Sequence, residues 1–307
     1  MKLSDDVVNW VANLAPRILL QKALLYNLTA TADFQTSLIE SFPLSGLIVP
    51  VPVGYQYQSA IAHSLTATDT RDAATLAHHL AQAIAQSIST QSGGDRSAVA
   101  ILMPGLQLQA TRQGYLLITL APEAITHWLQ HVGNAPAPPM ICAEGCEPLP
   151  ISGGGSWPLC DRLHLSLPML LQWAYSRCAT WLGQLASPDA DIKPNQTTRR
   201  PPAIDFTRVH SHNSFSTHDT LTGHLLWPTL MRALDQMAAR PQVKTGLGQG
   251  YAIAAAVYQF DAETRLSHLP TLLEPERLHH GSTLRATQKI LAVIITQLLG
   301  LTPTSHL

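Results

Sequence analysis

Histidine and cysteine side chains are the first residues of this chain that could do chemistry. Four histidines gather in one polar stretch, and two cysteines lie close together upstream: His210, His212, His218 and His224, and Cys142 and Cys146. A zinc site needs four nitrogen or sulfur ligands in recognisable pairs, and no second pair accompanies these cysteines. We therefore expect no metal ion and no cofactor. An enzyme that uses the histidine-rich stretch is kept only as a third hypothesis.

Two glycine-containing segments could suggest nucleotide binding. The SGGGS run at residues 152–156 lacks the lysine and the following helix of a phosphate-binding loop, so it is interpreted as a linker. The HHGSTLRAT run at residues 279–287 resembles an ATP-binding His-x-Gly-His turn only in part, because the second histidine is absent. Too few residues follow to build a parallel sheet, so this run is predicted to open the last helix. No catalytic residue is assigned.

The charge of the chain gives little indication of a partner. The net charge is −1 over 307 residues, and charged residues make up 13% of the chain. Residues 1–159 carry 6 Lys and Arg against 10 Asp and Glu, whereas residues 160–307 carry 13 against 10. The charge of the second half is therefore compatible with a polyanionic ligand, but this charge alone is not evidence for one.

The chain has the sequence features of a cytoplasmic protein. Four cysteines in a chain of this length, together with acidic residues where a secretory leader would be basic, indicate a reducing compartment. No run approaches the roughly 18 apolar residues of a membrane span. The nearest, residues 290–301, is predicted to be a buried C-terminal helix, and no membrane partner is expected.

Hydrophobic periodicity supplies the elements that would position any site. Alternating runs at residues 97–110 and 113–122 predict a β-hairpin, and residues 46–56 predict an edge strand. Helical patterns cover residues 4–41, with a break at Pro16, and 69–89, 122–132, 163–185, 221–239, 250–266 and 282–299.

These elements predict two domains joined by a linker. Residues 1–132 form an α+β domain, with a small antiparallel or mixed sheet and helices. Residues 133–160 form a Pro- and Gly-rich linker. Residues 161–307 form an all-α helical-bundle domain with an exposed insertion at residues 187–219.

Several segments, in order, resemble parts of arginyl-tRNA synthetases. GYLLITLAPE (residues 114–123) is similar to the stretch that closes the N-terminal tRNA-contacting domain of that family, and residues 72–84 resemble a helix of the same domain. LQWAYSRC (residues 171–178) resembles the opening helix of the DALR anticodon-binding domain. Residues 251–266 and 298–303 are similar to its central helix and its end.

The resemblance implies a synthetase relative without the catalytic domain. That domain would need hundreds of residues where this chain has residues 133–160, so aminoacylation is not expected. Leu117 also stands where the family has an asparagine available to tRNA. The first hypothesis is a non-catalytic protein that binds tRNA or another structured RNA. The alternative is a protein–protein interaction scaffold that kept the fold and lost RNA binding.

An RNA ligand would require cations for phosphates and aromatic rings for unstacked bases. Gln172, Tyr175 and Arg177 are the candidates within residues 171–178. Helical spacing does not place all three on one face, and a structural interpretation stays open, with Tyr175 in the core and Arg177 in an ion pair. Arg199 and Arg200 lie between polar residues and prolines in the insertion. They could contact phosphates, or they could belong to a solvated charged loop.

Overall fold

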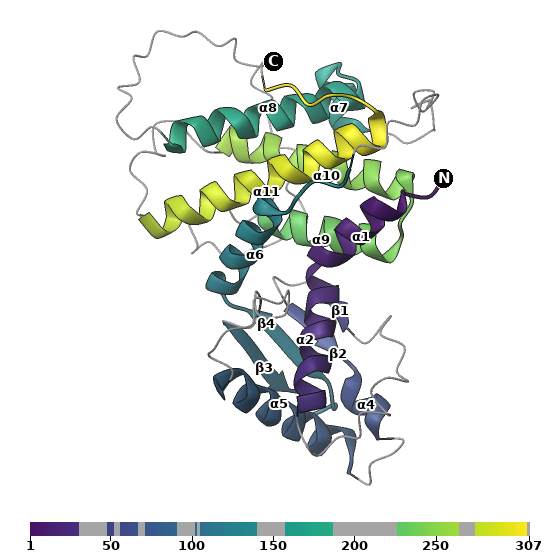
Figure 1. The fold of residues 1–307 in the computed structure, drawn as a ribbon, viewed down its shortest axis with the longest axis vertical. Coiled ribbons are helices and arrows are strands. Elements are labelled where there is room, and N and C mark those ends of the chain that lie inside the picture. Colours follow the sequence, from purple (N-terminus) through teal and green to yellow (C-terminus); the bar gives the residue numbers. More distant parts are fainter. Residues whose placement is uncertain are drawn as a thin grey trace.

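A four-stranded antiparallel sheet and a stack of helices form the two ends of the molecule (Figure 1). This arrangement confirms the predicted α+β region followed by a mainly helical region. The computed structural model describes residues 1–30, 48–51, 56–66, 71–90, 102, 105–139, 157–186, 226–263 and 274–305.

The first thirty residues form two helices, α1 (Asp5–Leu14) and α2 (Pro16–Ala30). The Ser4 hydroxyl caps α1 by accepting the Val7 N–H at 3.4 Å. Pro16 begins α2, because its missing N–H and fixed φ suit the first position of a helix and not its interior. The predicted break at Pro16 is therefore confirmed. The last part of this helical prediction, residues 31–41, lies outside the described residues.

The sheet has the strand order β1-β2-β4-β3. It consists of β1 (Ile48–Pro50), β2 (Gln56–Ser59), β3 (Leu106–Ala110) and β4 (Leu116–Leu120). Strands β3 and β4 form the predicted hairpin, and Gly114 takes a φ of +83° in its turn. A Cβ at Gly114 would also lie 2.5 Å from Ala73 Cβ, so both backbone conformation and space require glycine.

One face of the sheet packs on helices. Leu116, Ile118 and Leu120 of β4 are fully buried, and α5 (Ala73–Thr90) packs against β3 and against α2. The Asp72 carboxylate caps α5 by accepting the Thr75 N–H at 2.9 Å. This helix was predicted to start at residue 69; in the structure it starts at Ala73, behind this cap. A short helix, α4 (Ile61–Leu65), completes this region.

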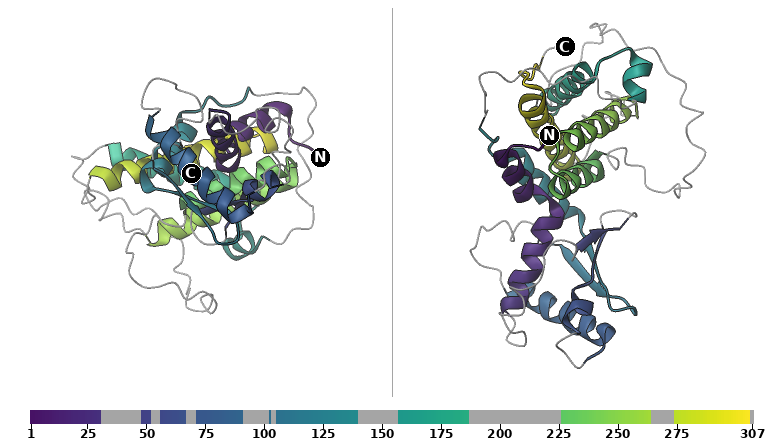
Figure 2. Two further views of the ribbon diagram at one scale, coloured as in Figure 1. Left: turned by 90° about the horizontal axis from the view of Figure 1, so that it is seen from below. Right: turned by 90° about the vertical axis from the view of Figure 1, so that its right-hand side faces the viewer.

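The helical region contains six further helices within the described residues. They are α6 (Pro122–Asn134), α7 (Pro158–Leu163), α8 (Leu167–Ala186), α9 (Leu226–Ala239), α10 (Val243–Glu263) and α11 (Glu274–Leu299). Helices α6 and α8 pack on α11, and α10 packs on α8 and α9 (Figure 2). The predicted linker residues 140–156 and the whole predicted insertion lie outside the described residues.

The two ends of the molecule share one hydrophobic core. Helix α1 packs on α9, and α6 packs on α11, so N-terminal segments contribute to the helical region. The Trp128 indole N–H donates to the Leu14 carbonyl at 2.9 Å, and the Trp10 indole N–H donates to the Pro136 carbonyl at 2.8 Å. The buried core cluster runs without interruption from α1 through β4 to α11. The domain boundaries drawn from the sequence stay a prediction.

Candidate nucleic-acid interface

Gln172 on α8 binds the C-terminal segment of its own chain. Its Nε2 donates to the Thr302 carbonyl at 2.8 Å, and its Oε1 accepts the Thr304 N–H at 2.9 Å. One turn further along, the Ser176 hydroxyl donates to the Ser305 carbonyl at 3.1 Å. The side-chain amide of Gln172 is therefore already engaged by main-chain groups of residues 302–304.

Arg177 on α8 is held by α10. Its Nε donates to Asp261 Oδ1, and the Trp181 indole N–H donates to the same oxygen at 3.0 Å. The Arg177 guanidinium carbon also lies 5.6 Å from the centre of the Trp181 ring. These contacts form the structural ion pair that the sequence left open as an alternative, and they tie α8 to α10.

The predicted α8 residues do not converge on one site. Tyr175 is half-buried and packs against the main core, whereas Gln172 and Arg177 contact the C-terminal segment and α10. Arg199 and Arg200 lie outside the described residues. Helix α8 thus offers an RNA ligand fewer free groups than its sequence suggests.

The cysteines and histidines show no metal-binding arrangement where they are described. Cys160 and Cys178 are buried free thiols, and burial raises the pKa of Cys178 to about 12, so it stays protonated. Within the described residues, no three His, Cys, Asp or Glu side chains are grouped to hold a metal ion. The predicted run at residues 279–287 lies inside α11, where His279 Nδ1 and Thr126 Oγ1 are 2.8 Å apart.

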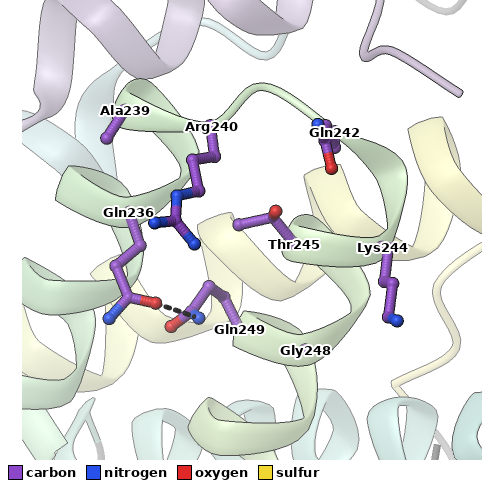
Figure 3. A pocket seen from close by; sticks show the side chains of 8 residues that line it. All are labelled: Gln236, Ala239, Arg240, Gln242, Lys244, Thr245, Gly248 and Gln249. Atoms are coloured by element: carbon purple, nitrogen blue, oxygen red, sulfur yellow. Dashed lines mark hydrogen bonds between the residues drawn. The ribbon is translucent and has the colours of Figure 1, made fainter.

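A polar hollow lies between the end of α9 and the start of α10 (Figure 3). Its volume is about 610 Å³. Two of the residues that line it, Arg240 and Lys244, are basic, and none is acidic. Gln236 and Gln249 join the two helices across it through a 2.7 Å hydrogen bond between their side-chain amides. The lining residues are Gln236, Ala239, Arg240, Gln242, Lys244, Thr245, Gly248 and Gln249.

The local sequence explains how the hollow forms. Pro241 cannot continue α9, and its carbonyl accepts the Leu3 N–H at 3.0 Å, so the N-terminal residues brace the connection to α10. Gly246 lies on the buried face of α10, where a Cβ would be 2.5 Å from Leu298 Cδ1. Gly248 lies among the hollow's lining residues, and a Cβ there would meet no heavy atom within 4 Å.

The sequence analysis missed Arg240 and Lys244, although the sequence contains a signal for them. Residues 236–260 hold no acidic residue, and these two side chains are their only charges, with Asp235 and Asp261 at either border. A charge pattern of this kind indicates a basic surface only when the helix connection is known, because the intervening Pro241 determines where the two cations lie.

The second face of the sheet carries glutamines. In the strand register Leu117 pairs with Gln58 on one side and Gln109 on the other, and Thr119 pairs with Gln56 and Gln107. These side chains alternate with the buried residues of β4, so they point away from α5. Gln107 and Gln109 are exposed, and the right-hand view of Figure 2 shows no described helix on the side of the sheet away from α2 and α5.

Comparisons of the chain with protein-family models, with curated proteins and with solved structures find no match. The resemblance to arginyl-tRNA synthetases therefore stays a prediction from the segments quoted above. None of the described helices is long and apolar enough to cross a membrane.

Proposed function

We propose that this chain is a non-catalytic RNA-binding protein related to arginyl-tRNA synthetases, with tRNA or another structured RNA as its ligand. The resembling segments support the proposal through their positions. GYLLITLAPE forms β4 and the start of α6, and LQWAYSRC lies within α8, the first long helix after the predicted linker. Residues 133–160 leave no room for an ATP-binding catalytic domain, so the proposed activity is binding alone.

The glutamine-bearing face of the sheet is the observation that carries the proposal. Leu117 occupies the position where the family has an asparagine, and it faces the side that no described helix covers. Its cross-strand neighbours Gln58 and Gln109 carry side-chain amides, the group that Leu117 lacks. Each amide offers two donors and an acceptor, which suits RNA base edges and 2′-hydroxyls.

Filter binding of full-length chain to a tRNA transcript tests this function. We expect binding at low salt that weakens as salt rises, because phosphate contacts release counterions. Gln109→Glu, which places a carboxylate on the open sheet face, is expected to weaken binding several-fold. Gln113→Glu is the matched control, because it adds the same charge in the exposed β3–β4 turn. Absence of salt-sensitive tRNA binding by the unaltered chain refutes the proposal.

A protein-binding role is the second candidate, and the geometry of Gln172 favours it. This residue already holds a main-chain segment through both the nitrogen and the oxygen of its side-chain amide, as a peptide-binding helix would. A stoichiometric protein partner that co-purifies free of nucleic acid, and is released by Gln172→Ala, would support this role. Retention of that partner by the variant would count against it.

A further inference from the structure

We infer that the hollow between α9 and α10 binds phosphate groups of an RNA backbone. This inference rests on the proposed RNA-binding function and adds a site to it. Three features of the hollow carry the argument: its cations lack acidic partners, its other polar groups are hydrogen-bonding amides and a hydroxyl, and it contains no aromatic ring.

The two cations of the hollow are available to a ligand. Arg240 and Lys244 are exposed, and within the described part of the chain neither side chain forms an ion pair or a hydrogen bond. Figure 3 shows the Arg240 guanidinium extending from the end of α9 over the hollow towards Gln249. By contrast, Arg177 pairs with Asp261, and Arg277 donates to the Leu185 carbonyl at 2.7 Å. Those two arginines stabilise the fold, whereas Arg240 has no such role in the described contacts.

The acidic residue nearest in sequence does not neutralise the hollow. Asp235 precedes the lining residue Gln236, but its side chain is buried and accepts hydrogen bonds from Arg17 N–H and Tyr57 Oη. Arg240 and Lys244 are the charged residues that line the hollow, and their charge favours an anion.

The remaining lining groups suit a phosphodiester with its ribose. Gln236, Gln242 and Gln249 supply amide donors and acceptors, and Thr245 supplies a hydroxyl. The volume of about 610 Å³ lies within the usual range of ligand sites. Bases would gain little here, because they bind by stacking on aromatic side chains. The site should therefore contribute affinity and little base preference.

Glycine in the lining of the hollow permits a sharp test. Gly248→Glu introduces a carboxylate beside Arg240 and Lys244, and its Cβ would meet no heavy atom within 4 Å. Gly183→Glu is the matched control, since Gly183 lies near the end of α8 and is equally open. Both changes replace a helical glycine by a better helix former, so both variants are expected to fold. Circular dichroism and thermal unfolding check this.

Binding of a fluorescently labelled tRNA transcript, followed by anisotropy over a series of salt concentrations, gives the readout. A phosphate contact contributes about fivefold to eightfold to affinity at about 0.1 M salt, and its loss lowers the salt slope by about 0.7–0.9. Arg240→Gln and Lys244→Gln should each show these changes. Gly248→Glu should weaken binding by at least the effect of one lost contact, and Gly183→Glu should leave it unchanged.

The outcomes separate failure of the site from failure of the function. Suppose that tRNA binds and that neither Gly248→Glu nor the two cation variants change the affinity or the salt slope. Phosphate binding in the hollow is then refuted, while the RNA-binding function stands. An equal loss in Gly183→Glu also overturns it. If the unaltered chain binds no tRNA, the proposed function fails. In that case calorimetry with inorganic pyrophosphate tests for a free phosphate ligand. Pyrophosphate binding that Gly248→Glu abolishes would overturn the assignment of the hollow to an RNA backbone.

Discussion

Stability of this fold should depend on pH through Asp235, which joins three elements at the junction of the sheet and the helices. The side chain is 5% exposed, and its carboxylate accepts the Arg17 N–H and the Tyr57 hydroxyl, both at 2.9 Å. Burial raises the pKa of Asp235 from 3.8 to about 6, although both hydrogen bonds and the Arg17 charge act in the opposite direction.

The sign of the effect follows from the raised pKa. Between pH 4 and pH 6 the folded chain binds more protons at Asp235 than the unfolded chain, so the free energy of unfolding decreases as pH rises. The stabilisation is complete below pH 4 and lost above pH 6. A difference of about 2 pKa units corresponds to about 3 kcal/mol.

Urea unfolding of the wild type and of Asp235→Asn from pH 3.5 to pH 7.5 measures this term. The difference between the two chains isolates Asp235, because every other carboxyl titrates in both. We expect the wild type to lose about 3 kcal/mol relative to the variant across this range. Tyr57→Phe removes a hydrogen bond to the carboxylate, so it should move the transition to higher pH. If the free energy of unfolding of the wild type, relative to that of Asp235→Asn, is constant or increases as pH rises, the raised pKa of Asp235 is refuted.

Two further predictions concern α10 and the C-terminal segment. Gly248→Ala should raise the free energy of unfolding by roughly 0.5–1 kcal/mol, whereas Gly246→Ala should lower it because its Cβ would overlap Leu298; thermal unfolding measures both, and equal effects would contradict the packing. Gln172→Ala should speed amide hydrogen exchange at Thr304, whose N–H loses its acceptor. Unchanged exchange at Thr304 would show that Gln172 does not hold this segment.

The sequence predicted those elements whose residues carry their own local signal. The alternation of Leu116, Ile118 and Leu120 predicted β4, and Pro122 predicted the start of α6; both are confirmed. Pro16 likewise marked the boundary of two helices because no interior helical position tolerates it. Several helix boundaries were misplaced. Helix α5 begins behind Asp72 rather than at residue 69, and α10 and α11 begin at Val243 and Glu274 instead of residues 250 and 282. The helix predicted at residues 163–185 is two helices, α7 and α8.

Contacts at the candidate sites could not be predicted in the same way. Gln172 binds main-chain atoms of residues 302–304, and main-chain partners leave no pattern in a sequence. Arg177 could have paired with any of several acids, and only the packing of α8 on α10 selects Asp261. The hollow depends on the connection between α9 and α10, so the cations that line it were recognised only in the structure.

The packing of α1 on α9 has a consequence for synthesis of the chain. The partner of residues 5–14, at residues 226–239, is synthesised about 200 residues later. At typical elongation rates this interval lasts roughly 10–40 s. During it the apolar face with Val7, Trp10 and Leu14 lacks the α9 surface against which it packs. The packing of α1 on α9 can therefore form only after α9 has been synthesised.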